Sequence, residues 1–339
     1  MKPASAQLRE IRKRHRLLVK IFVGVAYLAI GVLLVGWELQ EQGYLFSSND
    51  CDNLRSTPQV ENPLMDPLYG AILSLTTSGT SDRVSVVAIE SSLQVIQQNV
   101  CPARAFTADL IDAIASQGAA VIAIDKFYGD DACPPGDPGT AALKKSVTSL
   151  QTPPLNIPLV VGASTHEAPS ASATASGACI ALTPQLDLGP GIHRGLTRLN
   201  WDVLKLPLRW PVLLQDSDTK ASAGPESESF ALVAAQQADP ALLQNADLNL
   251  ALNSPLQPYA NVSGVLQRQT ATDLLCTVAP DKAKSWSINC AGHTTRLDLH
   301  NKLVVIGAES DSDYPAVLGK GMYGFDLQSH YIAALLSNS

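Results

Sequence analysis

VSVVAIESSLQVIQQNVCPARAFTADLIDAIASQGAAVIAID, residues 84–125, contains the pattern that decides the fold. Its two ends, 84–89 and 120–125, are apolar runs rich in Val and Ile, which is typical of strands buried on both faces of a parallel sheet. Between them, apolar residues recur at helical spacing over 106–114, and Gly118 is suited to end a helix. We therefore predict a strand-helix-strand unit with a right-handed crossover.

Other segments extend this α/β pattern. The apolar runs 158–163 and 302–308 predict two more strands of the same kind. Helices are expected at 141–150, 229–237 and 327–336, and surface loops at the polar, aperiodic stretches 164–178 and 215–228. The predicted fold class is α/β, with a mainly parallel central sheet flanked by helices and an N-terminal transmembrane helix.

Charge is distributed unevenly along the chain. Residues 1–20 carry seven basic side chains and one acidic side chain, a net charge of +6. Since the whole chain has a net charge of −7, residues 21–339 hold −13. A segment with this negative charge repels the phosphate backbone of DNA or RNA, so we expect no nucleic-acid partner.

The basic stretch precedes an apolar segment, residues 21–37, that contains no charged residue. As a helix with about 1.5 Å per residue, the segment is roughly 25 Å long, and neighbouring residues can extend it enough for a single membrane crossing. The basic residues before it place the N-terminus in the cytoplasm. A cleaved signal peptide is the alternative, but Trp37 and Leu39 are bulky where a cleavage site needs small residues. Small residues within the segment also allow the helix to pack closely, as in a homodimer.

These features define the expected organisation of the chain. Residues 1–20 form a cytoplasmic tail, 21–39 a transmembrane anchor, 40–80 a linker, and 81–337 an extracytoplasmic domain. All six cysteines follow the anchor, so disulfides are expected in an oxidising compartment. Cys276 and Cys290 flank a polar turn between two strand-like ends, and we predict a disulfide-closed hairpin there. No Cys-x-x-Cys motif or Cys/His cluster suggests zinc.

Four motifs, read in order over residues 84–336, resemble the type 2 CHASE domain. They are VSVVAIESSL at the first strand, CPARAFTADLIDAIASQGAAVIAID, GLTRLNWDVLKLPL, and LHNKLVVIGAESDSDYPAVLGKGMYGFDLQSHYIAALL at the end. Matching positions include Ser92, Arg104, Gly118, Asp125, Lys302, Gly307, Asp313 and Gly324. The chain departs from the family pattern at Glu90, where Asp is usual, at Cys101, where Trp is usual, and at Gln328-Ser329 in place of His-Ala.

The resemblance implies a sensory domain of bacterial signalling receptors. We therefore expect a non-catalytic signal-input protein of the bacterial inner membrane, with its main domain periplasmic and with no cofactor. It would pass its signal to a separate membrane protein or to an output domain that this sequence does not contain. The alternative is an envelope scaffold that binds its partner constitutively. An enzyme is a weaker alternative, because no Gly-x-Ser-x-Gly, His-Glu-x-x-His or paired-carboxylate signature is present.

Candidate ligand-binding residues follow the predicted strands, because parallel α/β sheets bind ligands at the carboxyl ends of their strands. They are Glu90, Asp125, Ser164, Thr165, Glu309, Asp311 and Asp313. Such carboxylates can hold a cation such as calcium, or the amino group of a small-molecule ligand. The alternative is that Glu90 and Asp125 only cap the loops that follow them. In GKGMYG, residues 319–324, a polar stretch separates the glycines from the preceding strand, so we expect a turn there rather than a dinucleotide site.

Overall fold

A computed structural model describes residues 81–129, 132–167, 180–182, 184–197, 229–244, 266–294, 297–309, 316–317 and 320–337. All of them belong to one compact unit of the chain, residues 67–339. The predicted tail, anchor and linker, the predicted loop at 215–228, and Cys51 and Cys179 lie outside the described residues. None of the described helices is both long and apolar enough to cross a membrane.

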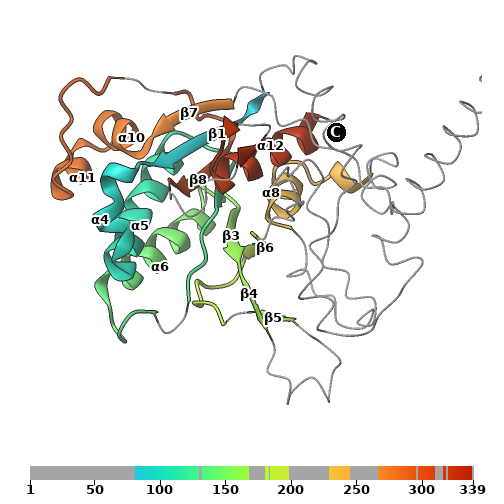
Figure 1. Cartoon of the computed structure of the whole chain (residues 1–339), viewed down its shortest axis with the longest axis horizontal. Coiled ribbons are helices and arrows are strands. Elements are labelled where there is room, and N and C mark those ends of the chain that lie inside the picture. Colours follow the sequence, from blue (N-terminus) through green and yellow to red (C-terminus); the bar gives the residue numbers. More distant parts are fainter. Residues whose placement is uncertain are drawn as a thin grey trace, which may run out of the picture. The chain divides into compact units, whose positions relative to one another are not determined.

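A six-stranded, wholly parallel sheet forms the centre of the described residues (Figure 1). Its spatial order is β6-β3-β2-β8-β1-β7. The strands are β1 (Ser81–Ile89), β2 (Val121–Ile124), β3 (Leu159–Ala163), β6 (Ile192–Leu196), β7 (Leu266–Thr270) and β8 (Leu303–Ala308). The four strands predicted from apolar runs are confirmed as β1, β2, β3 and β8, and the two edge strands are additional.

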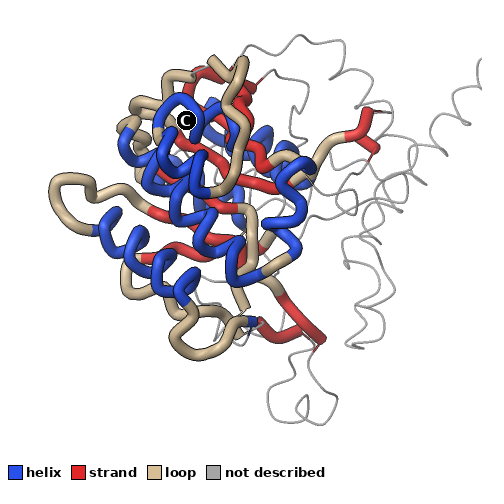
Figure 2. The backbone as a smooth tube through the Cα atoms, turned by 90° about the vertical axis from the view of Figure 1, so that its left-hand side faces the viewer, coloured by secondary structure: helices blue, strands red, loops and turns tan. Residues whose placement is uncertain are grey.

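Helices cover both faces of this sheet. One face carries α4 (Gln94–Gln98), α5 (Val100–Ser116), α6 (Pro138–Gln151), α10 (Ala271–Val278) and α11 (Pro280–Ser285), and Figure 2 shows this side with helices in front of the strands. The other face carries α8 (Phe230–Ala238) and α12 (Gly324–Ser337). Alternate strand residues enter the two cores: Ile122 and Ile124 pack with the first set of helices, and Val121 and Ala123 with the second. Burial on both faces explains the continuous apolar runs of the central strands.

Side-chain caps fix where several helices begin. The carboxylate of Asp137 accepts the Thr140 N–H at the start of α6 at 2.6 Å, and the Ser229 hydroxyl accepts the Leu232 N–H at the start of α8 at 3.2 Å. Both interactions satisfy N–H groups that a helix cannot bond internally.

The three helices predicted at 141–150, 229–237 and 327–336 are confirmed as α6, α8 and α12, and the helical pattern at 106–114 is confirmed as α5.

The predicted surface loop at 164–178 is wrong at its start. Residues Thr165–Glu167 form β4, which pairs antiparallel with β5 (Ile180–Leu182) in a separate two-stranded sheet. The polar composition of the segment concealed β4, and residues 168–178 of the segment lie outside the described part of the chain. A second small hairpin, β9 (Ala316–Val317) and β10 (Lys320–Gly321), precedes α12, and Gly319 of the glycine-rich segment lies outside the described residues.

The Cys276–Cys290 disulfide is confirmed, with a Cα–Cα distance of 5.4 Å. The predicted hairpin around it is wrong, because Cys276 lies in α10 and Cys290 follows α11. The Thr270 hydroxyl accepts the Asp273 N–H and starts α10, which sets the helical register of the strand-like Leu-Leu-Cys sequence. A second disulfide, Cys101–Cys133, joins the start of α5 to the segment before α6 and was not predicted.

Candidate functional site

The carboxyl ends of three neighbouring strands bring acidic residues together. In the parallel register Ile89 lies beside Ala308, and Ile124 beside Ile306, so β1, β8 and β2 end at one edge. The Glu309 N–H donates to the Ile89 carbonyl and the Asp125 N–H to the Ile306 carbonyl, each at 2.9 Å. Glu90 and Asp125 therefore each follow a strand that is about 4.8 Å from β8, the strand that Glu309 follows.

A pocket of about 350 Å³ opens at this edge. Ile89, Ile124 and Ile306 from the strand ends and Phe325 from α12 supply its apolar lining. Its polar lining consists of Glu90, Gln97, Gln98, Thr107, Asp125, Lys126 and Glu309. The volume is near the lower end of small-molecule sites, which are roughly 300–1,000 Å³.

The pocket contains only some of the predicted site residues. Glu90, Asp125 and Glu309 line it. Ser164 and Thr165 do not, because they follow β3, which is separated from β8 and β1 by β2. Asp311 and Asp313 lie outside the described residues.

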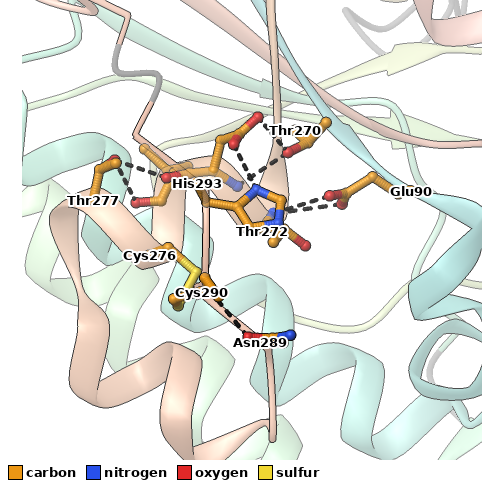
Figure 3. The surroundings of a disulfide bond; sticks show 11 residues. Glu90, Thr270, Thr272, Cys276, Thr277, Asn289, Cys290 and His293 are labelled. Atoms are coloured by element: carbon orange, nitrogen blue, oxygen red, sulfur yellow. Dashed lines mark hydrogen bonds and ion pairs between the residues drawn. A yellow bond between two sulfur atoms is a disulfide. The ribbon is translucent and has the colours of Figure 1, made fainter.

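Glu90 binds the start of a helix from a distant part of the chain. Its two carboxylate oxygens accept the Thr272 N–H at 3.3 and 3.4 Å, and Figure 3 shows the side chain pointing toward the first turn of α10. A carboxylate near a helix N-terminus is stabilised by the unpaired N–H groups there. Glu90 therefore caps a helix from a distant part of the chain, whereas the alternative expected it to cap the loop that follows it.

The Cys276–Cys290 disulfide belongs to the same local structure. Thr272 and Cys276 both lie in α10, and Figure 3 shows the disulfide beside the contact between Glu90 and the helix. His293 Nδ1 lies 2.8 Å from the Asp273 carboxylate and adds a further tie between α10 and the segment after Cys290. The disulfide therefore fixes α10, the helix whose first turn binds Glu90 in the wall of the pocket.

Lys126 is a pocket residue that sequence reasoning missed. Its ammonium donates to Gln97 Oε1 at 3.0 Å and lies 5.8 Å from the centre of the Tyr128 ring. Burial, with a smaller effect of the nearby Arg104 guanidinium, lowers the pKa of Lys126 from 10.5 to about 8. The available signal was a basic residue directly after the β2 end, next to Asp125.

Arg268, on the unpredicted edge strand β7, connects the pocket to the last helix. Its guanidinium contacts the carboxylates of Glu309 and Asp326 at 2.5 Å each and lies 5.4 Å from the centre of the Phe325 ring. Burial raises the pKa of Asp326 above 3.8, against the opposing effect of Arg268. Because Glu309 and Phe325 line the pocket, Arg268 contacts two wall residues and α12 at once.

Two motif residues have structural roles near this site. Arg104 is buried and donates to the Thr140 hydroxyl at 2.6 Å and to the Gly129 carbonyl at 2.5 Å, which holds α5 against α6 and the segment after β2. Gly307 lies against Phe325, where a Cβ atom would be 2.1 Å from the Phe325 Cγ. The glycine therefore allows the aromatic ring to approach the end of β8.

The described residues contain one group of three side chains spaced like metal ligands, Cys101, Cys133 and Asp137. Its cysteines are joined in a disulfide, so they do not offer thiolates. Glu90, Asp125 and Glu309 do not form such a group within the described part of the chain. Their arrangement therefore fits a ligand that contacts them separately better than a single ion held by all three.

The family of the chain follows from comparison with known proteins. The family described as the CHASE2 domain matches residues 43–339, nearly the whole length, and the chain belongs to that family. CHASE2 is a family of extracellular sensory domains, and the domain is not itself catalytic. No curated protein and no solved structure matches the chain.

Proposed function

We propose that the protein is a membrane-anchored receptor subunit whose CHASE2 domain senses a small polar molecule in the pocket at the ends of β1, β2 and β8. The protein sits in the bacterial inner membrane through residues 21–39, with residues 1–20 in the cytoplasm and residues 81–337 in the periplasm. It has no catalytic activity of its own. It passes the signal to a separate membrane protein or to an output domain outside this sequence.

The pocket is the observation that carries this proposal. It lies where parallel α/β sheets bind ligands, and it combines an apolar lining with charged and amide side chains that approach from different elements. A domain that served only to present a surface to another protein would not need this arrangement of carboxylates and a partly buried ammonium.

The disulfides support the periplasmic location. The described residues contain two, Cys101–Cys133 and Cys276–Cys290, and no free cysteine. Disulfides of this kind persist in oxidising compartments and are rare in the cytosol. The charge of residues 1–20 supports the orientation, since basic residues are retained on the cytoplasmic side.

Arg268 provides a route from the pocket to the rest of the domain. A ligand that attracts or displaces Glu309 changes the balance of the contacts that Arg268 makes with Glu309 and Asp326. The start of α12, which carries Phe325 and Asp326, then shifts relative to β8. The structural change that a partner reads is therefore expected at α12.

A pull-down from native membranes distinguishes this receptor from a constitutive scaffold. The tagged full chain is purified with and without the low-molecular-mass solutes of its growth medium, and the co-purifying membrane proteins are quantified. A receptor changes the amount or the cross-linking pattern of its partner when the solutes are present. A partner bound identically under both conditions would favour the envelope scaffold and refute the proposal.

A further inference from the structure

The polar groups of the pocket are divided by charge and by hydrogen-bonding type. Lys126 and Gln97 supply N–H donors, and Glu90 and Asp125 supply carboxylate acceptors. Glu309 is already paired with Arg268, which approaches it from β7. Glu90, which also accepts the Thr272 N–H, and Asp125 are the other two carboxylates of the lining, and Lys126 is its ammonium, so the pocket contains both signs of charge.

The amide of Gln97 has an incomplete set of hydrogen bonds. Its Oε1 accepts from the Lys126 ammonium, which fixes the orientation of the amide because the reverse orientation would place two donors together. The Gln97 Nε2 is then buried without a hydrogen-bond partner. Buried polar atoms are nearly always satisfied, so an orphan donor in the wall of a pocket indicates an acceptor supplied from elsewhere.

Lys126 points to the same missing acceptor. An ammonium has three N–H donors, and the Gln97 oxygen takes one of them. Since Lys126 is also partly buried, water satisfies the remaining donors less well than it would at the surface. A carboxylate that contacts both Lys126 Nζ and Gln97 Nε2 would supply these donors with charge-assisted partners.

Charge excludes the simplest ligands for this site. A ligand with only an anionic group would add negative charge beside Glu90 and Asp125, and a ligand with only a cationic group would leave the Lys126 and Gln97 donors without an acceptor. A ligand with both groups satisfies both sides of the pocket.

We propose that the pocket binds a compact zwitterion, an α-amino acid or a close relative, with its carboxylate on Lys126 and Gln97 and its ammonium on Glu90 and Asp125. This assignment rests on the proposed sensory function and names the chemical class of its ligand. The apolar lining from Ile89, Ile306 and Phe325 then receives the side chain of the ligand.

Calorimetric titration of the full chain in detergent tests the assignment. The probes are the twenty common α-amino acids, n-butylamine, butyrate and CaCl₂. At least one amino acid is expected to bind, and its amide and N-acetyl derivatives, which lack one of the two charges, are expected to bind at least about tenfold more weakly.

Two substitutions locate the two ends of the ligand. Lys126→Met is expected to weaken binding of the amino acid roughly 10- to 100-fold and to leave binding of its amide derivative unchanged. Asp125→Asn is expected to weaken binding of the amino acid but not binding of its N-acetyl derivative. Lys144→Met and Asp82→Asn change exposed residues of the same types and serve as matched controls. Retained binding of one derivative also shows that each variant is folded.

The outcomes separate the ligand class from the function. If n-butylamine or CaCl₂ binds in a way that depends on Asp125 and no amino acid binds, the assignment of a zwitterionic ligand is wrong, but the proposed sensory function is not contradicted. Amino-acid binding that both variants leave unchanged would place the ligand elsewhere and overturn the assignment. If neither the probes nor the solutes of the growth medium bind, both the assignment and the proposed function fail.

Discussion

Acidification is expected to destabilise the protein through His330, a histidine of α12 that is 8% exposed. Burial lowers the pKa of His330 from 6.5 to about 4. Below pH 6.5 the unfolded chain therefore binds a proton that the folded protein binds only near pH 4. The stability that the neutral histidine confers is fully present above pH 6.5 and is lost as the pH falls toward 4.

The expected loss follows from the two pKa values. Each pKa unit between the folded and unfolded states corresponds to about 1.4 kcal/mol, so His330 contributes about 3 kcal/mol across this window. The free energy of unfolding of a domain is typically about 5–15 kcal/mol, so one residue accounts for a large part of it.

Urea unfolding followed by circular dichroism between pH 7.5 and pH 4 measures this contribution. The wild type is compared with His330→Gln, which has no titrating group at this position, and with His300→Gln, which removes an exposed histidine. Other groups whose pKa is lowered by folding, such as Asp273 and His193, are shared by all three proteins and cancel in the comparison. Equal pH dependence for wild type and His330→Gln would refute the reasoning.

Three substitutions test the packing, capping and covalent ties of the domain by their effect on the urea midpoint. Gly307→Ala places a methyl group against Phe325 and should cost about 1–3 kcal/mol; an unchanged midpoint would show that the ring moves freely. Ser229→Ala removes the cap of α8 and should cost about 1 kcal/mol, whereas no loss would mean that the cap is dispensable. Replacing both Cys276 and Cys290 by Ala opens a short loop, with a sequence separation of 14, and should cost about 3 kcal/mol; equal stability of the two proteins would contradict a structural role.

The central strands and long helices were predictable because buried elements have apolar or periodically apolar sequences. β8 is buried on both faces, so its sequence LVVIGA is almost wholly apolar and admits few other interpretations. The edge strands β6 (IHRGL) and β7 (LQRQT) pair on one side only and keep polar residues, so neither produced an apolar run. Length and periodicity reveal buried elements better than edge elements.

The candidate site was predictable where it depends on strand ends and not where it depends on distant elements. Glu90, Asp125 and Glu309 follow apolar runs and could be placed at the pocket from sequence. Arg268 could not, because the strand that carries it was not recognised. Lys126 and Gln97 could not, because a lysine after a strand and an amide at this position are not in themselves sequence signals of a binding site.

The most direct test of the sensory account is hydrogen exchange of the full chain in native-membrane nanodiscs, with and without the low-molecular-mass solutes of its growth medium. We expect slower exchange at the carboxyl ends of β1, β2 and β8 and altered exchange at the start of α12, and Asp125→Asn should reduce both effects while Asp82→Asn retains them. Identical exchange with and without the solutes would contradict the claim that this pocket receives a signal.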